Sequence, residues 1–245
     1  MSKVIAHRGA ANDLPENSLA AFERAIRDGA DGIEFDVRLS SDGQPFVFHN
    51  FELDALTSGT GPLVAHSSKE LRRLLLKSSD TETHSIPILE DVLDLAVGRT
   101  TLEIELKALQ PEIVGIVKAA LAPYRSHWEA MEITSFEPAL LRLMADECPI
   151  PVDILTPRGE PWMTSDYIAY QGIQRGRLAG ARAVHLDASQ VSGSVVEQIR
   201  DSGFSVHVHG VDTRETLTTV LDLGIERFDT DHLGDVLQWL RIRDG

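Results

Sequence analysis

Apolar residues along the chain recur with two spacings that alternate from one end to the other. Asp31–Leu39 has an apolar residue at about every second position and Lys3–Ala6 is a short apolar run, and both patterns predict β-strands. In Ser18–Arg27 apolar residues are three and four positions apart, which predicts an amphipathic helix capped by Asn17 or Ser18. Further strands are predicted at Thr101–Lys107, Met131–Ser135, Val152–Leu155, Ala183–Leu186, Phe204–His209 and Arg227–Thr230. Further helices are predicted at Leu89–Val97, Pro111–Leu121, Pro138–Asp146, Asp166–Ala179, Ser194–Ser202, Arg214–Leu223 and Leu233–Arg241.

One stretch interrupts this alternation. Asp42-Gly43 predicts a tight turn from the second strand into a short additional strand, Pro45–His49. Residues 50–87, which follow, are the least regular part of the chain, with a short helix predicted near Ser68–Leu75. Because this length is unusual for a plain connection, we predict that residues 50–87 form an insertion or a lid.

The alternation of elements predicts the fold class. Strands that alternate strictly with helices imply a parallel sheet, and eight such units in 245 residues suit a closed (β/α)8 TIM barrel. An open doubly wound sheet is the alternative, but the first strand is not followed by a Gly-x-Gly-x-x-Gly motif. We therefore predict a single-domain α/β barrel over residues 1–245, with a small insertion after the second strand.

Composition narrows the classes of partner and location. The chain has 38 Asp and Glu against 23 Lys and Arg, a net charge of −15, which disfavours nucleic acid and anionic membranes as partners. The single cysteine, Cys148, excludes an internal disulfide framework. No apolar run approaches the about 20 residues that span a bilayer, and the N-terminus does not resemble a secretion signal. We therefore expect a cytoplasmic protein without stable membrane insertion, and association into a homo-oligomer stays open.

Charged residues occupy one face of two predicted strands. Glu34 and Asp36 alternate with apolar residues on the first of these strands, as do Glu103, Glu105 and Lys107 on the second. In a barrel these columns would face the interior, where carboxylates that lack a compensating charge are costly. A set of carboxylates without a thiol selects a hard cation such as Mg²⁺, Ca²⁺ or Mn²⁺. The alternative is a pair of solvated edges whose charges form salt bridges.

Histidines end two of the predicted strands. His7 and His49 would both lie at the carboxyl rim, where barrel enzymes keep their chemistry, and a histidine pair can act as general base and general acid. Arg8 and Lys107 would supply positive charge for a phosphoryl oxygen. Histidines inside later strands have two possible roles, as part of a polar barrel lining or as substrate contacts. The substrate-binding candidates among them are His185 and His209.

The order of these motifs resembles the glycerophosphodiester phosphodiesterase family over essentially the whole chain. The matching pieces are His7-Arg8-Gly9, Pro15-Glu16-Asn17-Ser18, the runs holding Glu34 with Asp36 and Glu105 with Lys107, the run ending at His49, Thr134-Ser135-Phe136, the run around His185, and Gly224–Asp231. The resemblance implies a metal-dependent barrel enzyme that hydrolyses glycerophosphodiesters to sn-glycerol 3-phosphate and an alcohol.

The resemblance also implies roles for individual residues. Glu34, Asp36 and Glu105 match ligands of one divalent cation, Mg²⁺ or Ca²⁺, with Mn²⁺ as a further option. His7 and His49 match the acid/base pair. Arg8 and Lys107 match phosphate-binding positions, and Glu16 matches a polar residue that supports the rim. The partner implied is therefore a small anionic phosphodiester.

Some positions depart from the family pattern. Asn50 stands where the family usually has Asp, and Ala55-Leu56 replaces an Arg-Thr pair. Glu103 replaces a common Asn, and residues 209–212 also differ. Alternatives therefore stay open: a different diester, such as a lysophospholipid or glycerophosphoinositol, or a non-catalytic barrel that binds a phosphate ligand.

Overall fold

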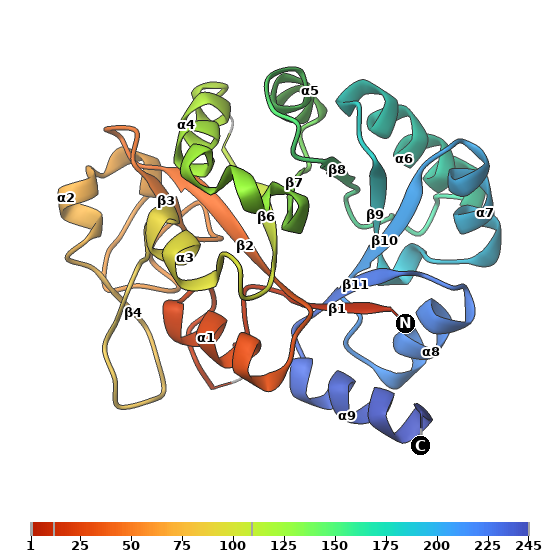
Figure 1. Ribbon diagram of the computed structural model, residues 1–245, viewed down its shortest axis with the longest axis horizontal. Coiled ribbons are helices and arrows are strands. Elements are labelled where there is room, and N and C mark those ends of the chain that lie inside the picture. Colours follow the sequence, from red (N-terminus) through yellow and green to blue (C-terminus); the bar gives the residue numbers. More distant parts are fainter. Residues whose placement is uncertain (1, 12, 109, 245) are drawn as a thin grey trace. The chain divides into compact units, whose positions relative to one another are not determined.

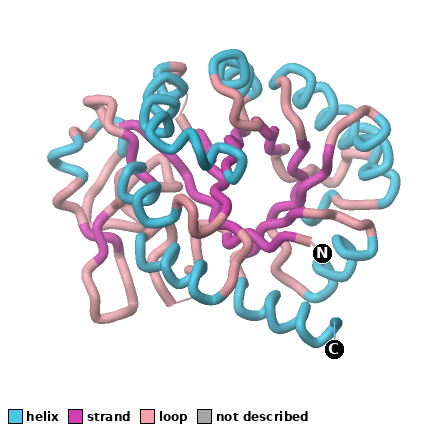
Figure 2. Tube along the Cα trace, in the orientation of Figure 1, coloured by secondary structure: helices cyan, strands magenta, loops and turns pink. Residues whose placement is uncertain are grey.

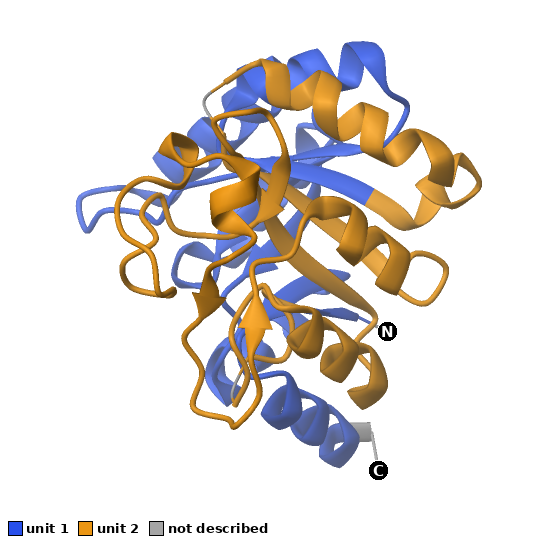
Figure 3. Ribbon diagram, turned by 90° about the vertical axis from the view of Figure 1, so that its left-hand side faces the viewer, with its two compact units in different colours: residues 1–5, 132–245 blue, residues 6–131 orange. Residues whose placement is uncertain are grey.

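The computed structural model describes residues 2–11, 13–108 and 110–244, and helices and strands follow one another in the predicted order (Figure 1). Strands alternate with helices along the chain (Figure 2). The chain divides into two compact units, one of residues 1–5 with 132–245 and the other of residues 6–131 (Figure 3).

The sheet of the 6–131 unit is built around strand β2 (Gly32–Leu39). Strand β6 (Thr101–Leu106) pairs with it in parallel, and β3 (Pro45–Val47) pairs with it antiparallel through the predicted turn. The register of the parallel pair places Glu34 opposite Glu103 and Asp36 opposite Glu105. Side chains alternate between the two faces of a strand, so these four carboxylates share one face of the pair.

Helix α1 (Leu19–Asp28) packs against the other face of β2. It begins at Ser18, whose side chain accepts a hydrogen bond from the amide of Ala21, so Ser18 and not Asn17 is the N-cap. The buried ring of Phe22 meets that of Phe35 edge to face, with 5.8 Å between centroids. Because Phe35 lies between Glu34 and Asp36 in sequence, this apolar contact fixes the strand from behind the acidic face.

Residues 50–87 form a packed insertion with short elements of its own. These are the 3-10 helix η1 (Leu63–Ala65), α2 (Ser68–Leu71), β4 (Leu75–Leu76) and β5 (His84–Ser85). The helix predicted over Ser68–Leu75 is wrong in its second half, because Leu75 pairs with Ser85 in a small antiparallel sheet. The insertion is held by a buried apolar cluster of Phe46, Phe48, Leu53, Leu63, Leu71, Leu76, Ile86 and Ile88.

The remaining elements of the 6–131 unit surround its sheet. They are helices α3 (Leu89–Ala96) and α4 (Glu112–Leu121) and the 3-10 segment η2 (Ala122–Ala130). The predicted strand and helix bounds agree with the observed ones to within a few residues.

The sheet of the other unit has the strand order β1-β11-β10-β9-β8-β7. These strands are β1 (Lys3–Ala6), β7 (Met131–Ser135), β8 (Val152–Leu155), β9 (Ala183–Asp187), β10 (Ser205–His209) and β11 (Arg227–Thr230). Neighbours from β7 to β11 pair in parallel. The helices between and after them are α5 (Pro138–Glu147), α6 (Ser165–Ala179), η3 (Ala188–Gln190), α7 (Gly193–Asp201), α8 (Arg214–Asp222) and α9 (Leu233–Asp244). Within the described ranges, no helix has the length and apolar character needed to cross a membrane.

Candidate active site

Three buried carboxylates meet on the acidic face of β2 and β6. Glu34, Asp36 and Glu105 each offer an oxygen, and these oxygens all lie within 4.8 Å of one another. Glu103 is also buried, but it does not belong to this group. The parallel register sets Asp36 directly beside Glu105, and Glu34 precedes Asp36 by two residues on the same face of β2.

Two cationic side chains lie against this carboxylate cluster. The Nζ atom of Lys107 is 2.7 Å from Oε1 of Glu105 and 3.3 Å from Oδ1 of Asp36. On the other side, Nε of Arg8 is 3.4 Å from Oδ2 of Asp36, and the backbone N–H of Arg8 donates to Oε2 of Glu34. The two cations predicted to bind phosphate therefore lie beside the predicted metal ligands.

The segment that carries Arg8 has an unusual backbone. Arg8 and Asn17 both have a positive φ, of 53° and 57°, which is uncommon for residues other than glycine and clusters at functional sites. The amide of Asn17 donates to the carbonyl of Arg8, and its side-chain Nδ2 donates to Oδ2 of Asp36 over 2.7 Å. The Arg8 guanidinium also donates to both oxygens of Glu16. Asn17 is thus a site residue, although the sequence predicted it only as a helix cap and as part of the Pro15–Ser18 motif, with no role of its own in the site.

Both predicted acid/base histidines lie beside the cluster. Nε2 of His7 is 3.8 Å from Oε2 of Glu34, and the side chain of His7 is partly exposed. His49 follows β3, and its Nδ1 is 2.9 Å from Oδ1 of Asn50. Both imidazoles are close enough to Asp36 to help lower its pKa.

The site shifts the ionisation of its carboxylates in opposite directions. Burial and the neighbouring Asp36 raise the pKa of Glu34 well above its usual value. The same two causes, partly offset by Lys107, raise the pKa of Glu105 to about 7. Burial would also raise the pKa of Asp36, but Lys107 and Arg8 outweigh it and lower that pKa. The imidazole of His49 has its pKa lowered to about 4, mainly by burial.

Arg38 connects His49 to Lys107 through hydrogen bonds that the sequence did not predict. Its Nε donates to the backbone carbonyl of His49 and its guanidinium NH1 to that of Lys107, both over 2.8 Å. These bonds tie the end of β3 to the end of β6. In the sequence, Arg38 continues the alternation of Glu34 and Asp36 along β2, and this pattern was the one indication that Arg38 lies near the site.

The carboxylate cluster fits a divalent cation. Oε1 of Glu34 is buried and accepts no hydrogen bond within the described part of the chain, so an acceptor points into the cluster without a donor. All the ligand atoms are carboxylate oxygens, as hard cations prefer. A bound cation would reverse the repulsion that raises the pKa values of Glu34 and Glu105.

A second group of buried titratable residues lies in the unit of residues 132–245. It contains Glu132, Asp153, His185 and His207. Arginines already neutralise its carboxylates: Arg182 bonds Glu132 and Asp153, and Arg227 lies 2.8 Å from Glu132. The cluster of Glu34, Asp36 and Glu105 offers carboxylate oxygens alone, as a hard cation prefers, whereas two of the four ligands here are imidazoles; the all-carboxylate cluster is therefore the better candidate for such a metal.

The predicted substrate contacts His185 and His209 have partners in this same unit. Nε2 of His185 is 2.9 Å from Nδ1 of His207, and the His185 side chain is buried. Nδ1 of His209 is 4.0 Å from Asp187, and its Nε2 is 3.4 Å from the carbonyl of Thr156. A role for either histidine in substrate binding stays a prediction.

The sequence and the site geometry agree with one protein family. The profile of the glycerophosphoryl diester phosphodiesterase family matches residues 7–235. The chain belongs to this family. The glycerophosphodiester phosphodiesterase of Caldanaerobacter subterraneus subsp. tengcongensis is 30% identical over 239 residues, which is 93% of each chain. The predicted resemblance is confirmed, and the chain is an enzyme of the phosphoric diester hydrolase class.

Solved structures agree with the fold. A protein of Silicibacter pomeroyi assigned to the glycerophosphoryl diester phosphodiesterases aligns with a TM-score of 0.85 and 26% identity, over 99% of this chain and 94% of that one. An Oleispira antarctica phosphodiesterase, solved with its product sn-glycerol-3-phosphate, aligns with a TM-score of 0.82 and 22% identity, over 98% and 97% of the chains. The predicted (β/α)8 TIM barrel is confirmed as the fold class.

Proposed function

We propose that this phosphodiesterase hydrolyses glycerophosphodiesters to sn-glycerol 3-phosphate and an alcohol, with a divalent cation in its carboxylate cluster and His7 and His49 as the acid/base pair. The observation that carries the proposal is the convergence of three buried carboxylates, two cations and two histidines around Asp36. The other described group with carboxylates, arginines and two histidines, in the unit of residues 132–245, has both of its carboxylates bonded by Arg182.

Glu34, Asp36 and Glu105 would hold the cation. When bound, it would neutralise charge on the phosphoryl group, which is the main requirement of phosphoryl transfer besides positioning. Mg²⁺, Ca²⁺ and Mn²⁺ all suit a set of three carboxylates completed by water.

Arg8 and Lys107 would bind the phosphoryl oxygens. Their side chains lie on either side of Asp36, at 3.4 Å and 3.3 Å. Glu16 holds the Arg8 guanidinium through both carboxylate oxygens, and Asn17 holds Asp36. A fixed cationic frame of this kind stabilises charge without reorganising during the reaction.

The two histidines differ in ways that suit different roles. His49 is half-buried and has a low pKa, so it is neutral near pH 7 and its Nε2 can accept the proton of the attacking hydroxyl. His7 is partly exposed and lies beside Glu34, with 3.8 Å between Nε2 and Oε2, and we assign it the role of giving a proton to the departing alkoxide. His49 takes up one proton and His7 releases one. The two histidines can then exchange roles when water completes the hydrolysis.

The experiment is an assay of purified enzyme on a panel of glycerophosphodiesters that includes glycerophosphocholine, glycerophosphoethanolamine, glycerophosphoglycerol and glycerophosphoinositol. We expect release of sn-glycerol 3-phosphate that stops with chelator and returns with Mg²⁺, Ca²⁺ or Mn²⁺. Turnover that persists at full rate in the presence of chelator would contradict the proposed requirement for a divalent cation. The absence of turnover with every diester would contradict the substrate class.

A further inference from the structure

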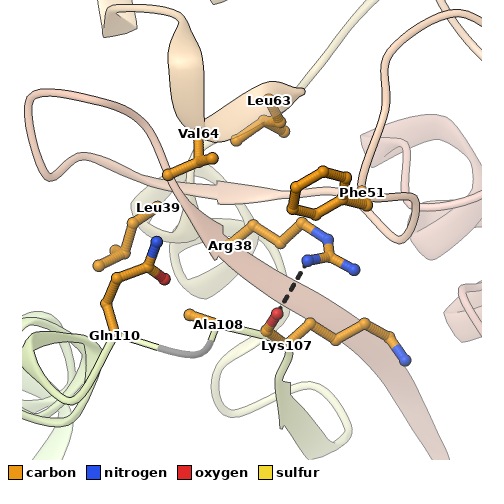
Figure 4. Close-up of a pocket in the computed structure, with 8 residues that line it drawn as sticks. All are labelled: Arg38, Leu39, Phe51, Leu63, Val64, Lys107, Ala108 and Gln110. Atoms are coloured by element: carbon orange, nitrogen blue, oxygen red, sulfur yellow. Dashed lines mark hydrogen bonds between the residues drawn. The ribbon is translucent and has the colours of Figure 1, made fainter. Parts of the chain in front are cut away.

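A cavity of about 270 Å³ lies beside the site, between the ends of β2 and β6 and the insertion. Its apolar walls are Leu39, Phe51, Leu63, Val64 and Ala108 (Figure 4). We call it the Phe51 pocket. Resting on the function proposed above, we propose that it binds a neutral apolar group of the leaving alcohol, a short alkyl or an aryl substituent.

The pocket and the carboxylate cluster share Lys107. This residue lines the pocket, and its ammonium reaches Glu105 and Asp36 in the cluster. A phosphoryl group bound by Lys107 would therefore have one of its two ester substituents beside the Phe51 pocket.

Two of the residues that line the pocket are held in place by contacts with neighbouring segments. Leu63 belongs to the apolar cluster of the insertion, and its amide donates to the carbonyl of Phe51. Arg38 lines the same pocket and donates to the carbonyl of Lys107 (Figure 4). A second bond, to the carbonyl of His49, also holds its guanidinium in place. Phe51, which follows His49 by two positions, is nevertheless 57% exposed. A large apolar side chain held open beside a catalytic residue is typical of a ligand site.

The charges around the pocket select against a cationic alcohol. Arg38 and Lys107 line it, and Gln110 is the other polar residue there; none of the described lining residues is a carboxylate. Recognition of a quaternary ammonium relies on aromatic cages or acidic groups, and the described lining offers one aromatic ring, Phe51, and no carboxylate. A neutral alcohol needs neither and can bury its carbon atoms against the apolar walls.

The volume limits the size of that group. At about 30 Å³ for each water-sized group, the cavity holds roughly nine of them. This matches a butyl, hexyl or phenyl substituent and is too small for the whole chain of a long fatty acid.

The test compares glycerol 3-phosphate esters of ethanol, butanol, hexanol, phenol and choline. We expect kcat/KM to rise about four-fold for each methylene from ethanol to hexanol, mostly through KM, and the choline ester to be the poorest. Equal rates for the ethyl, hexyl and choline esters would overturn the pocket while leaving the proposed function intact. No metal-dependent turnover of any ester would overturn the function and this inference together.

Two variants test whether the preference for longer alcohols arises in the Phe51 pocket. Phe51→Ser should remove most of the gain from the longer alcohols, and Val64→Trp, which fills the pocket, should raise KM for the hexyl ester about ten-fold while the ethyl ester changes little. Leu75→Ser is the matched control, because Leu75 is an exposed apolar residue of the same insertion that does not line the pocket. The inference fails if either pocket variant keeps the wild-type preference, or if Leu75→Ser loses it.

Discussion

The imidazole of His49 is hydrogen-bonded to the side chain of Asn50, with 2.9 Å between Nδ1 and Oδ1. An amide oxygen can only accept, so Nδ1 carries the proton and the lone pair of Nε2 is left for catalysis. The amide bears no charge, so it orients the ring without stabilising the imidazolium as a carboxylate would. Burial then dominates and lowers the pKa of His49 to about 4.

Asn50→Asp should raise the pKa of His49, because a carboxylate next to the ring favours its charged form. We expect the acidic limb of the kcat/KM profile to move to higher pH by about one unit or more. A pH–rate profile of both proteins measures this. The control is Asn50→Ala, which removes the acceptor without adding charge and should reduce the rate without an upward shift of the limb. An unchanged limb in Asn50→Asp would show that His49 is not the base.

Replacing either histidine should remove chemistry while sparing metal binding. His7→Asn and His49→Asn are expected to lower kcat by about 10²–10⁴-fold, the usual contribution of a positioned acid or base. Stabilisation of the protein by Mn²⁺ in thermal unfolding should persist, because neither side chain is a proposed ligand. His127→Asn, at an exposed position of the same unit, should match the wild type. Wild-type turnover in His49→Asn would favour a different base.

Metal affinity should increase with pH. Glu34 and Glu105 have raised pKa values in the metal-free protein, so a cation must displace protons to bind. For the same reason the contribution of Glu105 to metal-free stability is full below the ordinary pKa of 4.5 and is lost as pH rises through about 7. Titrations of Mn²⁺ by thermal shift at about pH 5.5 and about pH 7.5 should give tighter binding at the higher pH. Affinity that is equal at both, or weaker at the higher pH, would contradict a site made of these carboxylates.

The charged group of the 132–245 unit should matter for stability. Arg182 bonds the buried carboxylates of Glu132 and Asp153, so Arg182→Met leaves buried negative charge that Arg227 offsets in part. We expect a loss of about 3 kcal/mol in the free energy of unfolding, measured by urea denaturation. Arg142→Met removes an exposed pair with Asp146 and should change stability by less than about 1 kcal/mol. Equal losses in the two variants would contradict a buried network.

Local patterns were sufficient to predict the parts of the site that lie on regular strands. The period of two placed Glu34, Asp36 and Glu105 on one face, and the ends of strands located His7 and His49. The family motifs then connected these pieces, because their order along the chain matched.

Contacts between distant segments were not predictable in this way. Asn17 looked like a helix cap, and its bond to Asp36 depends on a left-handed backbone that the sequence does not specify for asparagine. Arg38 donates hydrogen bonds to the backbone carbonyls of His49 and Lys107. Because every residue has a backbone carbonyl, the sequence cannot indicate which two carbonyls Arg38 will bind. The ion pairs of Arg182 with Glu132 and Asp153 likewise join residues from different strands, and only the folded chain brings them together.

The most direct test of the proposed metal site compares Glu105→Gln with Glu103→Gln. Both residues are buried carboxylates on the same face of β6, but only Glu105 belongs to the cluster. Metal-dependent release of sn-glycerol 3-phosphate should fall by at least about 100-fold in Glu105→Gln, with weaker binding of Mn²⁺, and by only a few-fold in Glu103→Gln. If Glu105→Gln keeps its metal-dependent turnover, or if the two variants lose it equally, Glu34, Asp36 and Glu105 do not form the metal site.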